Sequence, residues 1–154
     1  MFHFTLTYQP MFFICSFMEI YKPDITSQCP LPIFLFAVSA GFPSPAEDFT
    51  EKTLDLNDFI EHPASTFFVR AEGDSMIGAG IFDGDLLIVD KSITPKHNSI
   101  VIASIHGDLT MKRLIKKGDK WLLKPENPDY PILELEEQSQ IWGVVKNCMR
   151  DLEK

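Results

Sequence analysis

The chain has 154 residues, 45% of them apolar and 23% charged, and this composition is typical of a globular protein with one domain and an appendage. Aspartate and glutamate number 22 against 14 for lysine and arginine, so the formal net charge at pH 7 is -8. Such acidity disfavours a broad phosphate-binding surface, and therefore direct nucleic-acid binding. It favours protein partners.

The cysteines Cys15, Cys29 and Cys148 are odd in number and contain no CxxC pair. They predict neither a disulfide framework nor a zinc site, and they fit a reducing cytoplasm. The four histidines are scattered along the chain, and we interpret them as surface or filler residues. No phosphate-binding GxxxxGK[ST] or GxGxxG motif is present. The sequence thus predicts no metal and no cofactor.

Charge divides the chain at about residue 40. Residues 1–40 carry three charged side chains but hold seven of the thirteen phenylalanines, whereas residues 41–154 carry nearly all of the charge. We predict an apolar N-terminal arm over 1–40 and a folded body over 41–154. The apolar runs of the arm are shorter than the roughly 20 residues that a membrane-spanning helix needs, so no membrane association is predicted.

Two other interpretations of the arm stay open. The run from Phe34 to Ala40, before Gly41, is similar to the end of a secretory signal, although the basic segment that begins such signals is missing. Residues 1–17 also have the pattern of an extension that the rest of the chain does not need, so that Met18 is an alternative start of the protein.

The region after residue 40 begins with Gly41-Phe42-Pro43-Ser44-Pro45, which predicts an extended linker because each proline lacks an N–H and disfavours helix before it. A short helix over Leu54–Glu61 is expected next, with Thr53 as its N-cap and Pro63 after its end.

The remainder consists of short apolar or β-branched runs separated by turns such as Asp83-Gly84 and Lys117-Gly118-Asp119. We predict seven strands: Thr66–Ala71, Asp85–Asp90, Ser99–Ile105, Leu109–Ile115, Lys120–Lys124, Ile132–Leu135 and Gln140–Cys148. The expected fold class is therefore mainly β, a compact antiparallel domain with one short helix, preceded by the extended arm.

Few residues in this chain have the pattern of a reactive site. Asp83, Asp85 and Asp90 lie close together but lack the rest of a calcium loop, so we interpret them as solvated turn residues. No histidine is placed beside a serine in a recognisable nucleophile-elbow motif, so a Ser-His-Asp triad is not indicated. The remaining combination is serine with lysine.

Ser75 lies in Gly73-Asp74-Ser75-Met76, just after a predicted strand and among glycines. Such a loop presents a hydroxyl and lets another backbone approach closely. The same pattern also fits an ordinary turn serine, so on these residues alone both interpretations remain open.

Lys112 is the second candidate, because strand alternation places Thr110, Lys112 and Leu114 on one face. If that face is turned to the core, burial lowers the lysine pKa and supplies a base able to activate a serine. If it is turned to water, Lys112 is a plain edge-strand lysine.

Three segments carry a resemblance: Ala40 to Phe49; Gly73-Asp74-Ser75-Met76 followed by Asp83 to Asp90; and Lys112-Arg113-Leu114. In this order they resemble the LexA-type self-cleaving serine peptidases over about residues 40–154. Within that family the chain is most similar to the branch that serves error-prone DNA polymerases as accessory subunit.

The resemblance implies a Ser75–Lys112 dyad in a LexA and signal-peptidase-like core that cuts the chain's own Ala40–Gly41 bond. It also implies a cytoplasmic homodimer, activation by RecA filaments on single-stranded DNA, and a UmuC-like Y-family polymerase subunit as partner in SOS mutagenesis. Two alternatives are a non-catalytic polymerase-binding dimer module and an exported signal-peptidase-like protein. A DNA-binding repressor is disfavoured, since the arm has no helix-turn-helix pattern and almost no basic residues.

Overall fold

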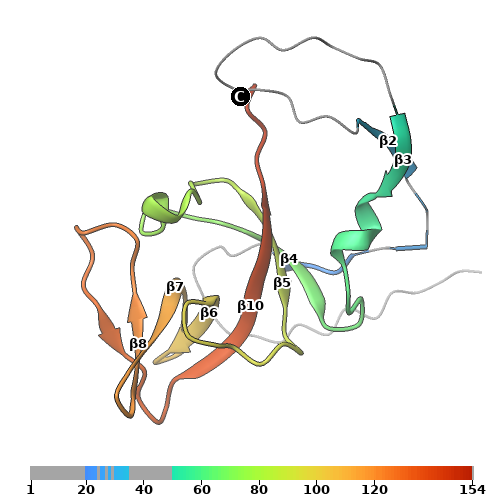
Figure 1. Cartoon of the computed structure of the whole chain (residues 1–154). Coiled ribbons are helices and arrows are strands. Elements are labelled where there is room, and N and C mark those ends of the chain that lie inside the picture. The colour runs from blue at the N-terminus through green and yellow to red at the C-terminus, as the bar shows by residue number, and fades with distance from the viewer. Residues whose placement is uncertain (1–19, 24, 27, 29, 35–49, 154) are drawn as a thin grey trace, which may run out of the picture.

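The computed structural model describes residues 20–23, 25–26, 28, 30–34 and 50–153 (Figure 1). The described residues form strands and two single-turn 3-10 helices. They are β1 (Ile20–Tyr21), β2 (Pro30–Phe34), β3 (Thr50–Asp55), η1 (Leu56–Phe59), β4 (Thr66–Arg70), η2 (Ile77–Ala79), β5 (Leu86–Asp90), β6 (Ile100–Ile105), β7 (Asp108–Lys117), β8 (Lys120–Lys124), β9 (Leu133–Glu134) and β10 (Gln140–Met149). Every strand pair among them is antiparallel. The predicted mainly β class is confirmed.

Eight strands form one sheet in the order β1-β4-β5-β10-β6-β7-β8-β9, and β2 pairs with β3 in a separate two-stranded sheet (Figure 1). The long strand β10 joins the two halves of the larger sheet because it pairs with β5 along one part and with β6 along another. Its register shifts between Ile141 and Gly143 and again between Val145 and Asn147. Bulges of this kind bend a strand, and here they let β10 follow both partners.

Gly143 shows how closely β10 packs against β5. A Cβ atom at this position would lie 2.7 Å from the Val89 side chain and 3.3 Å from the Asp90 carbonyl oxygen. The sequence therefore needs a residue without a side chain where the two strands meet.

Two apolar clusters make the core. One is built around β4, β5 and the segment after β4; its buried members are Val69, Ala71, Met76, Ile81, Leu87, Val89 and Ile102. The other lies among β6, β7, β8 and β10; its buried members are Val101, Ala103, Leu114, Leu123 and Val144. Since Met76 adjoins Ser75 and Leu114 follows Lys112 by two residues, the two clusters anchor the two segments that carry the candidate site residues.

Two buried carboxylates flank β5, which corrects the expectation that Asp85 and Asp90 are solvated. Asp85 is 1% exposed; its oxygens accept hydrogen bonds from Arg150 Nε and from a terminal Arg150 nitrogen, both at 2.6 Å. The hydrogen bond from Arg150 holds the pKa of Asp85 well below its usual range, although burial opposes this. The pair ties the segment after β10 to the turn before β5.

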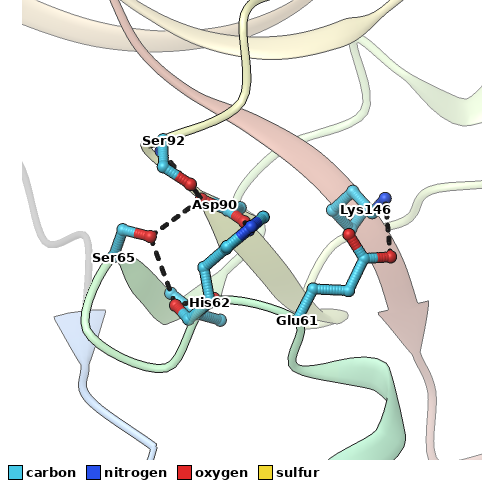
Figure 2. A network of polar contacts seen from close by, with 7 residues as sticks. Glu61, His62, Ser65, Asp90, Ser92 and Lys146 are labelled. Carbon is cyan, nitrogen blue, oxygen red and sulfur yellow. Dashed lines mark hydrogen bonds and ion pairs between the residues drawn. The ribbon is translucent and has the colours of Figure 1, made fainter.

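Asp90, at the end of β5, is 2% exposed and is the centre of a second network (Figure 2). It receives hydrogen bonds from Ser92 N–H at 2.7 Å and from the Ser92 and Ser65 hydroxyls at 2.6 and 3.1 Å, and His62 Nδ1 lies 2.6 Å away. Burial acts to raise the pKa of this carboxyl, but hydrogen bonds from Ser92, His62 and Ser65 outweigh it and bring the pKa to about 2. The network fixes the loop before β4 to the end of β5.

All seven predicted strands are present, with each end within two residues of the expected position. The predicted helix over Leu54–Glu61 is wrong. The residues up to Asp55 belong to β3, where Leu54 pairs with Leu31 of β2, and only Leu56–Phe59 turn helically. The cap is Asp55, which accepts from Asn57 N–H, and Thr53 lies inside the strand. Pairing with β2 outweighs the helical pattern, as tertiary contacts often do for short segments.

The linker over residues 41–45, the expected scissile bond and residues 1–17 lie outside the described part of the chain. Among the residues that are described, no helix has the length and hydrophobicity needed to cross a membrane.

Replacing Asp90 with Ala should lower the free energy of unfolding by about 1 to 3 kcal/mol at pH 7, because it removes the charged acceptor whose hydrogen bonds join the loop before β4 to the end of β5. Since the folded pKa of Asp90 lies below the unfolded value of 3.8, its contribution is complete above about pH 4 and is lost as the pH falls through about 2. Urea unfolding at pH 7 and pH 2 measures both effects. Asp119→Ala, in an exposed turn, is the control, and equal urea midpoints for Asp90→Ala and the parent at pH 7 would contradict a stabilising role of the Asp90 network.

Candidate active site

Ser75 lies in the segment between β4 and η2, next to the buried core residue Met76. The segment turns sharply at Gly73, whose φ of +81° is in the left-handed region that glycine adopts without strain. Asp83 holds this turn by accepting a hydrogen bond from Gly73 N–H at 2.8 Å. The turn sets the half-buried Ser75 just before η2 and close to the end of β4.

Lys112 lies in the middle of β7 and is only 6% exposed. Its neighbour on the same face, Leu114, is 2% exposed, so the face predicted from strand alternation is turned to the core. Lys112 Nζ is 3.1 Å from Ser75 Oγ. Ser75 and Lys112, the two candidate residues of the sequence analysis, are 37 positions apart in the chain and are in contact in the structure.

The Lys112 amine has two further contacts, because it donates to Thr110 Oγ1 at 2.8 Å and to the Met111 carbonyl oxygen at 2.9 Å. A neutral amine has two N–H groups and one lone pair. When the two N–H groups are used by Thr110 and Met111, the lone pair is left for the Ser75 hydroxyl. This arrangement is the one a general base requires.

Burial lowers the pKa of Lys112 below its ordinary value of 10.5. The cause is the loss of hydration of the ammonium form, which costs more than the loss of hydration of the neutral amine. No carboxylate forms an ion pair with Lys112 among the described residues, so no negative charge there favours the ammonium form. The amine is thus shifted toward the form that accepts a proton.

A cleft opens beside Ser75 between the end of β4 and the start of β7. Its walls include Val69 and Ala71 from one side and Leu109 and Met111 from the other, together with Ile102. Polar side chains line it as well, among them those of Arg70, Glu72, Asp108 and Thr110. A cleft beside two strand segments suits an extended peptide.

The backbone N–H groups next to the nucleophile in the chain are those of Ser75 itself and of Met76. Within the described part of the chain, neither Ser75 N–H nor Met76 N–H donates a hydrogen bond. Paired N–H donors beside a nucleophile are the arrangement that stabilises the oxyanion of a tetrahedral intermediate.

Sequence reasoning nominated Ser75 and Lys112 but missed Thr110 as a partner of the amine. Thr110 is two residues before Lys112 and therefore on the same strand face, so strand alternation was the available signal. Ala40 and Gly41, the expected scissile pair, lie outside the described residues. No group of three His, Cys, Asp or Glu side chains suited to a metal ion occurs among the residues described.

Known proteins resemble this chain over most of its length. Residues 32–146 match the family model described as Peptidase S24-like. Protein SamA of Salmonella typhimurium (strain LT2) is 53% identical over 119 residues, and protein MucA of Escherichia coli is 42% identical over 123 residues; each match covers 77% of this chain and 84% of the relative. A LexA repressor of Psychromonas ingrahamii is 39% identical over 116 residues, covering 73% of this chain and 56% of the repressor.

Thr110→Val should lower the pKa of Lys112 further, because it removes a hydroxyl that accepts from the ammonium form and leaves an apolar group in its place. The measurement is an NMR titration of the lysine side-chain signals in Ser75→Ala protein. Thr94→Val, in an exposed loop, is the control. A Lys112 pKa that Thr110→Val leaves unchanged would contradict the role of the hydroxyl, and a parent Lys112 pKa at the ordinary value of 10.5 would contradict the burial of the amine.

Proposed function

This chain belongs to the S24-like peptidase family and is a UmuD-like autoproteolytic protein of SOS mutagenesis, and we propose that Ser75 and Lys112 cut its own Ala40–Gly41 bond. The observation that carries the assignment of the two residues is the 3.1 Å contact between Lys112 Nζ and Ser75 Oγ, made by an amine that is almost fully buried.

The reaction follows from the contacts of the amine. Neutral Lys112 takes the proton of the Ser75 hydroxyl while Oγ attacks the Ala40 carbonyl carbon. The Ser75 and Met76 N–H groups receive the oxyanion of the tetrahedral intermediate. As the C–N bond breaks, protonated Lys112 gives its proton to the Gly41 nitrogen, which leaves as a free amine.

An ester between Ala40 and Ser75 remains after the first step. Lys112, neutral again, takes a proton from water as the water oxygen attacks this ester, and it returns the proton to Ser75 Oγ when the C–O bond breaks. The products are residues 1–40, ending in a carboxylate, and residues 41–154, beginning at Gly41. Small residues at the cut let the scissile carbonyl approach Ser75 closely.

The proposed scissile bond follows strand β2 closely in the sequence, and β2 pairs its last residue, Phe34, with Thr50 of β3. Ala40 is six residues after Phe34, so an extended chain would bring its carbonyl no further than about 20 Å from that strand end. Cleavage within one chain and cleavage of a second copy are both part of the proposal, and a homodimer accommodates either.

Cleavage would also change the surface that the body presents. The arm supplies β1, which pairs with β4, and β2, which pairs with β3. Loss of residues 1–40 thus leaves two strands of the body without these partners. The strands left unpaired support a change of partner on cleavage. From the likeness to the UmuD-like relatives we further propose that a RecA filament on single-stranded DNA promotes the cut in the cytoplasm and that residues 41–154 engage a UmuC-like Y-family polymerase subunit.

Ser75→Ala and Lys112→Ala should each abolish formation of the Gly41 fragment, since one removes the nucleophile and the other the base. Intact mass is measured before and after incubation with RecA, nucleotide and single-stranded DNA, and circular dichroism reports on the fold. Exposed Lys117→Ala is the control and should be cut like the parent. Continued cleavage of folded, isolated Ser75→Ala protein at Gly41 would refute the assignment.

The spontaneous rate of cleavage should rise about tenfold per pH unit and level off above the pKa of Lys112, because only the neutral amine acts as base. Burial lowers that pKa, so the plateau should begin below 10.5. The first-order rate of Gly41-fragment formation is followed from pH 6 to 10, with Ser75→Ala as a control for alkaline unfolding. A flat profile with the fold intact would exclude Lys112 as a base that titrates in this range.

A further inference from the structure

Besides Lys112, one other residue of β7 is linked to the segment that carries Ser75, residues 74–78, which we call the nucleophile segment. This residue is Arg113, on the opposite strand face from Lys112. The Lys112 side chain reaches Ser75 directly. Arg113 donates from Nε to Glu126 Oε1 at 2.6 Å. This ion pair is partly buried, with exposed side-chain fractions of 25% for Arg113 and 19% for Glu126. The Arg113 hydrogen bond also holds the pKa of Glu126 below its ordinary value.

The backbone N–H and C=O groups of Glu126 both form hydrogen bonds with the nucleophile segment. Its N–H donates to the Ser75 carbonyl oxygen at 2.9 Å, and its carbonyl oxygen accepts from Gly78 N–H at 2.8 Å. The contact is close, because a Cβ atom at Gly78 would lie 2.3 Å from the Glu126 oxygen. A shift of Glu126 therefore moves Ser75 as well.

Asn127 adds a third bond to the same segment. Its side chain is buried, with the residue 4% exposed, and Nδ2 donates to the Asp74 carbonyl oxygen at 3.2 Å. Oδ1 accepts from Asp129 N–H at 3.1 Å, which fixes the orientation of the amide. Tyr130, three residues on, donates its hydroxyl to the Asp74 side chain.

These bonds restrain the two peptide groups that flank Ser75. In a trans peptide the C=O and the following N–H point in opposite directions. A bond to the Asp74 carbonyl therefore aims Ser75 N–H, and a bond to the Ser75 carbonyl aims Met76 N–H. Both N–H groups are those that the proposed mechanism uses for the oxyanion.

We propose that Arg113, Glu126 and Asn127 are positioning residues for the cleavage reaction, which orient Ser75 and its two oxyanion donors toward the peptide and hold Ser75 within reach of Lys112. This inference rests on the proposed function. Arg113 acts through Glu126, and Asn127 acts on the neighbouring peptide. Strand β7 thus supplies the base from one face and the support of the nucleophile from the other.

The test measures two rates in the full chain. One is the first-order rate of Gly41-fragment formation, and the other is the rate at which a fluorophosphonate probe labels Ser75, which needs the nucleophile and its oxyanion donors but not the arm. Glu126→Ala and Asn127→Ala should each lower both rates by about 10-fold to 100-fold, the order expected for a misplaced reacting group. Both rates are measured well below the melting temperature of each variant.

The conservative variants Glu126→Gln and Arg113→Lys keep an acceptor and a donor at the pair, and they should retain at least about a third of both rates. The matched control is Glu134→Ala, which removes the ion pair of Lys120 and Glu134, at 2.8 Å, between β8 and β9. It should leave both rates unchanged.

A double-mutant cycle tests whether Arg113 acts on the nucleophile segment through Glu126. Arg113 also donates to the Asn98 carbonyl oxygen at 2.9 Å, so its replacement has a second structural effect. If Arg113 acts through Glu126, then Arg113→Gln in the Glu126→Ala background should lower the labelling rate by less than about twofold.

The outcomes separate this inference from the proposed function. The inference is overturned if folded Glu126→Ala and Asn127→Ala proteins are labelled at the parent rate. It is also overturned if these variants are cut slowly but labelled normally, because that result indicates a role in docking the arm. A lower melting temperature with unchanged labelling would show a merely structural role. A parent chain that is neither cut nor labelled at Ser75 would refute the proposed function, and the inference with it.

Discussion

The burial of one amine is the constraint on which the candidate active site depends. A lysine removed from water favours its neutral form, and a neutral amine is the form that accepts a proton from a serine. Lys112 is 6% exposed, and its polar contacts are a hydroxyl, a carbonyl and Ser75 Oγ. The strand face of Lys112, the apolar neighbours of β7 and the turn that carries Ser75 all keep this amine buried beside the Ser75 hydroxyl.

Two buried carboxylates of the body have the opposite environment. Asp85 is paired with Arg150, and Asp90 receives several hydrogen bonds, so that both carboxylates remain charged and join the ends of β5 to neighbouring segments. Buried charges with full hydrogen bonding maintain a structure, whereas a buried amine with only neutral partners is shifted toward reactivity. The same fold thus contains two stabilising carboxylates and one proposed base, distinguished by their partners.

The arm that the proposed reaction removes is part of the fold. Strand β1 extends the sheet at β4 and strand β2 pairs with β3, and both precede the proposed cut. The reaction would therefore remove the two short strands that the apolar arm contributes. Because unpaired strand edges and apolar surface are available to new partners, cleavage and a change of partner would follow from one event.

Local patterns in the sequence were enough to predict strands β4 to β10 and to nominate Ser75 and Lys112 as candidates, but they missed β1, β2 and β3. The resemblance of three segments, rather than local pattern, supplied the family and the pairing of Ser75 with Lys112. Alternation in Thr110, Lys112 and Leu114 placed these residues on one strand face, and the turn glycines around Ser75 marked a loop. The sequence left open which face of β7 is buried. It did not indicate that Leu54 belongs to a strand paired with the arm. Nor did it indicate that Glu126 and Asn127 form hydrogen bonds with the segment that carries Ser75. The folded chain settles these points, because they depend on contacts between residues far apart in the sequence, whose energies no local pattern contains.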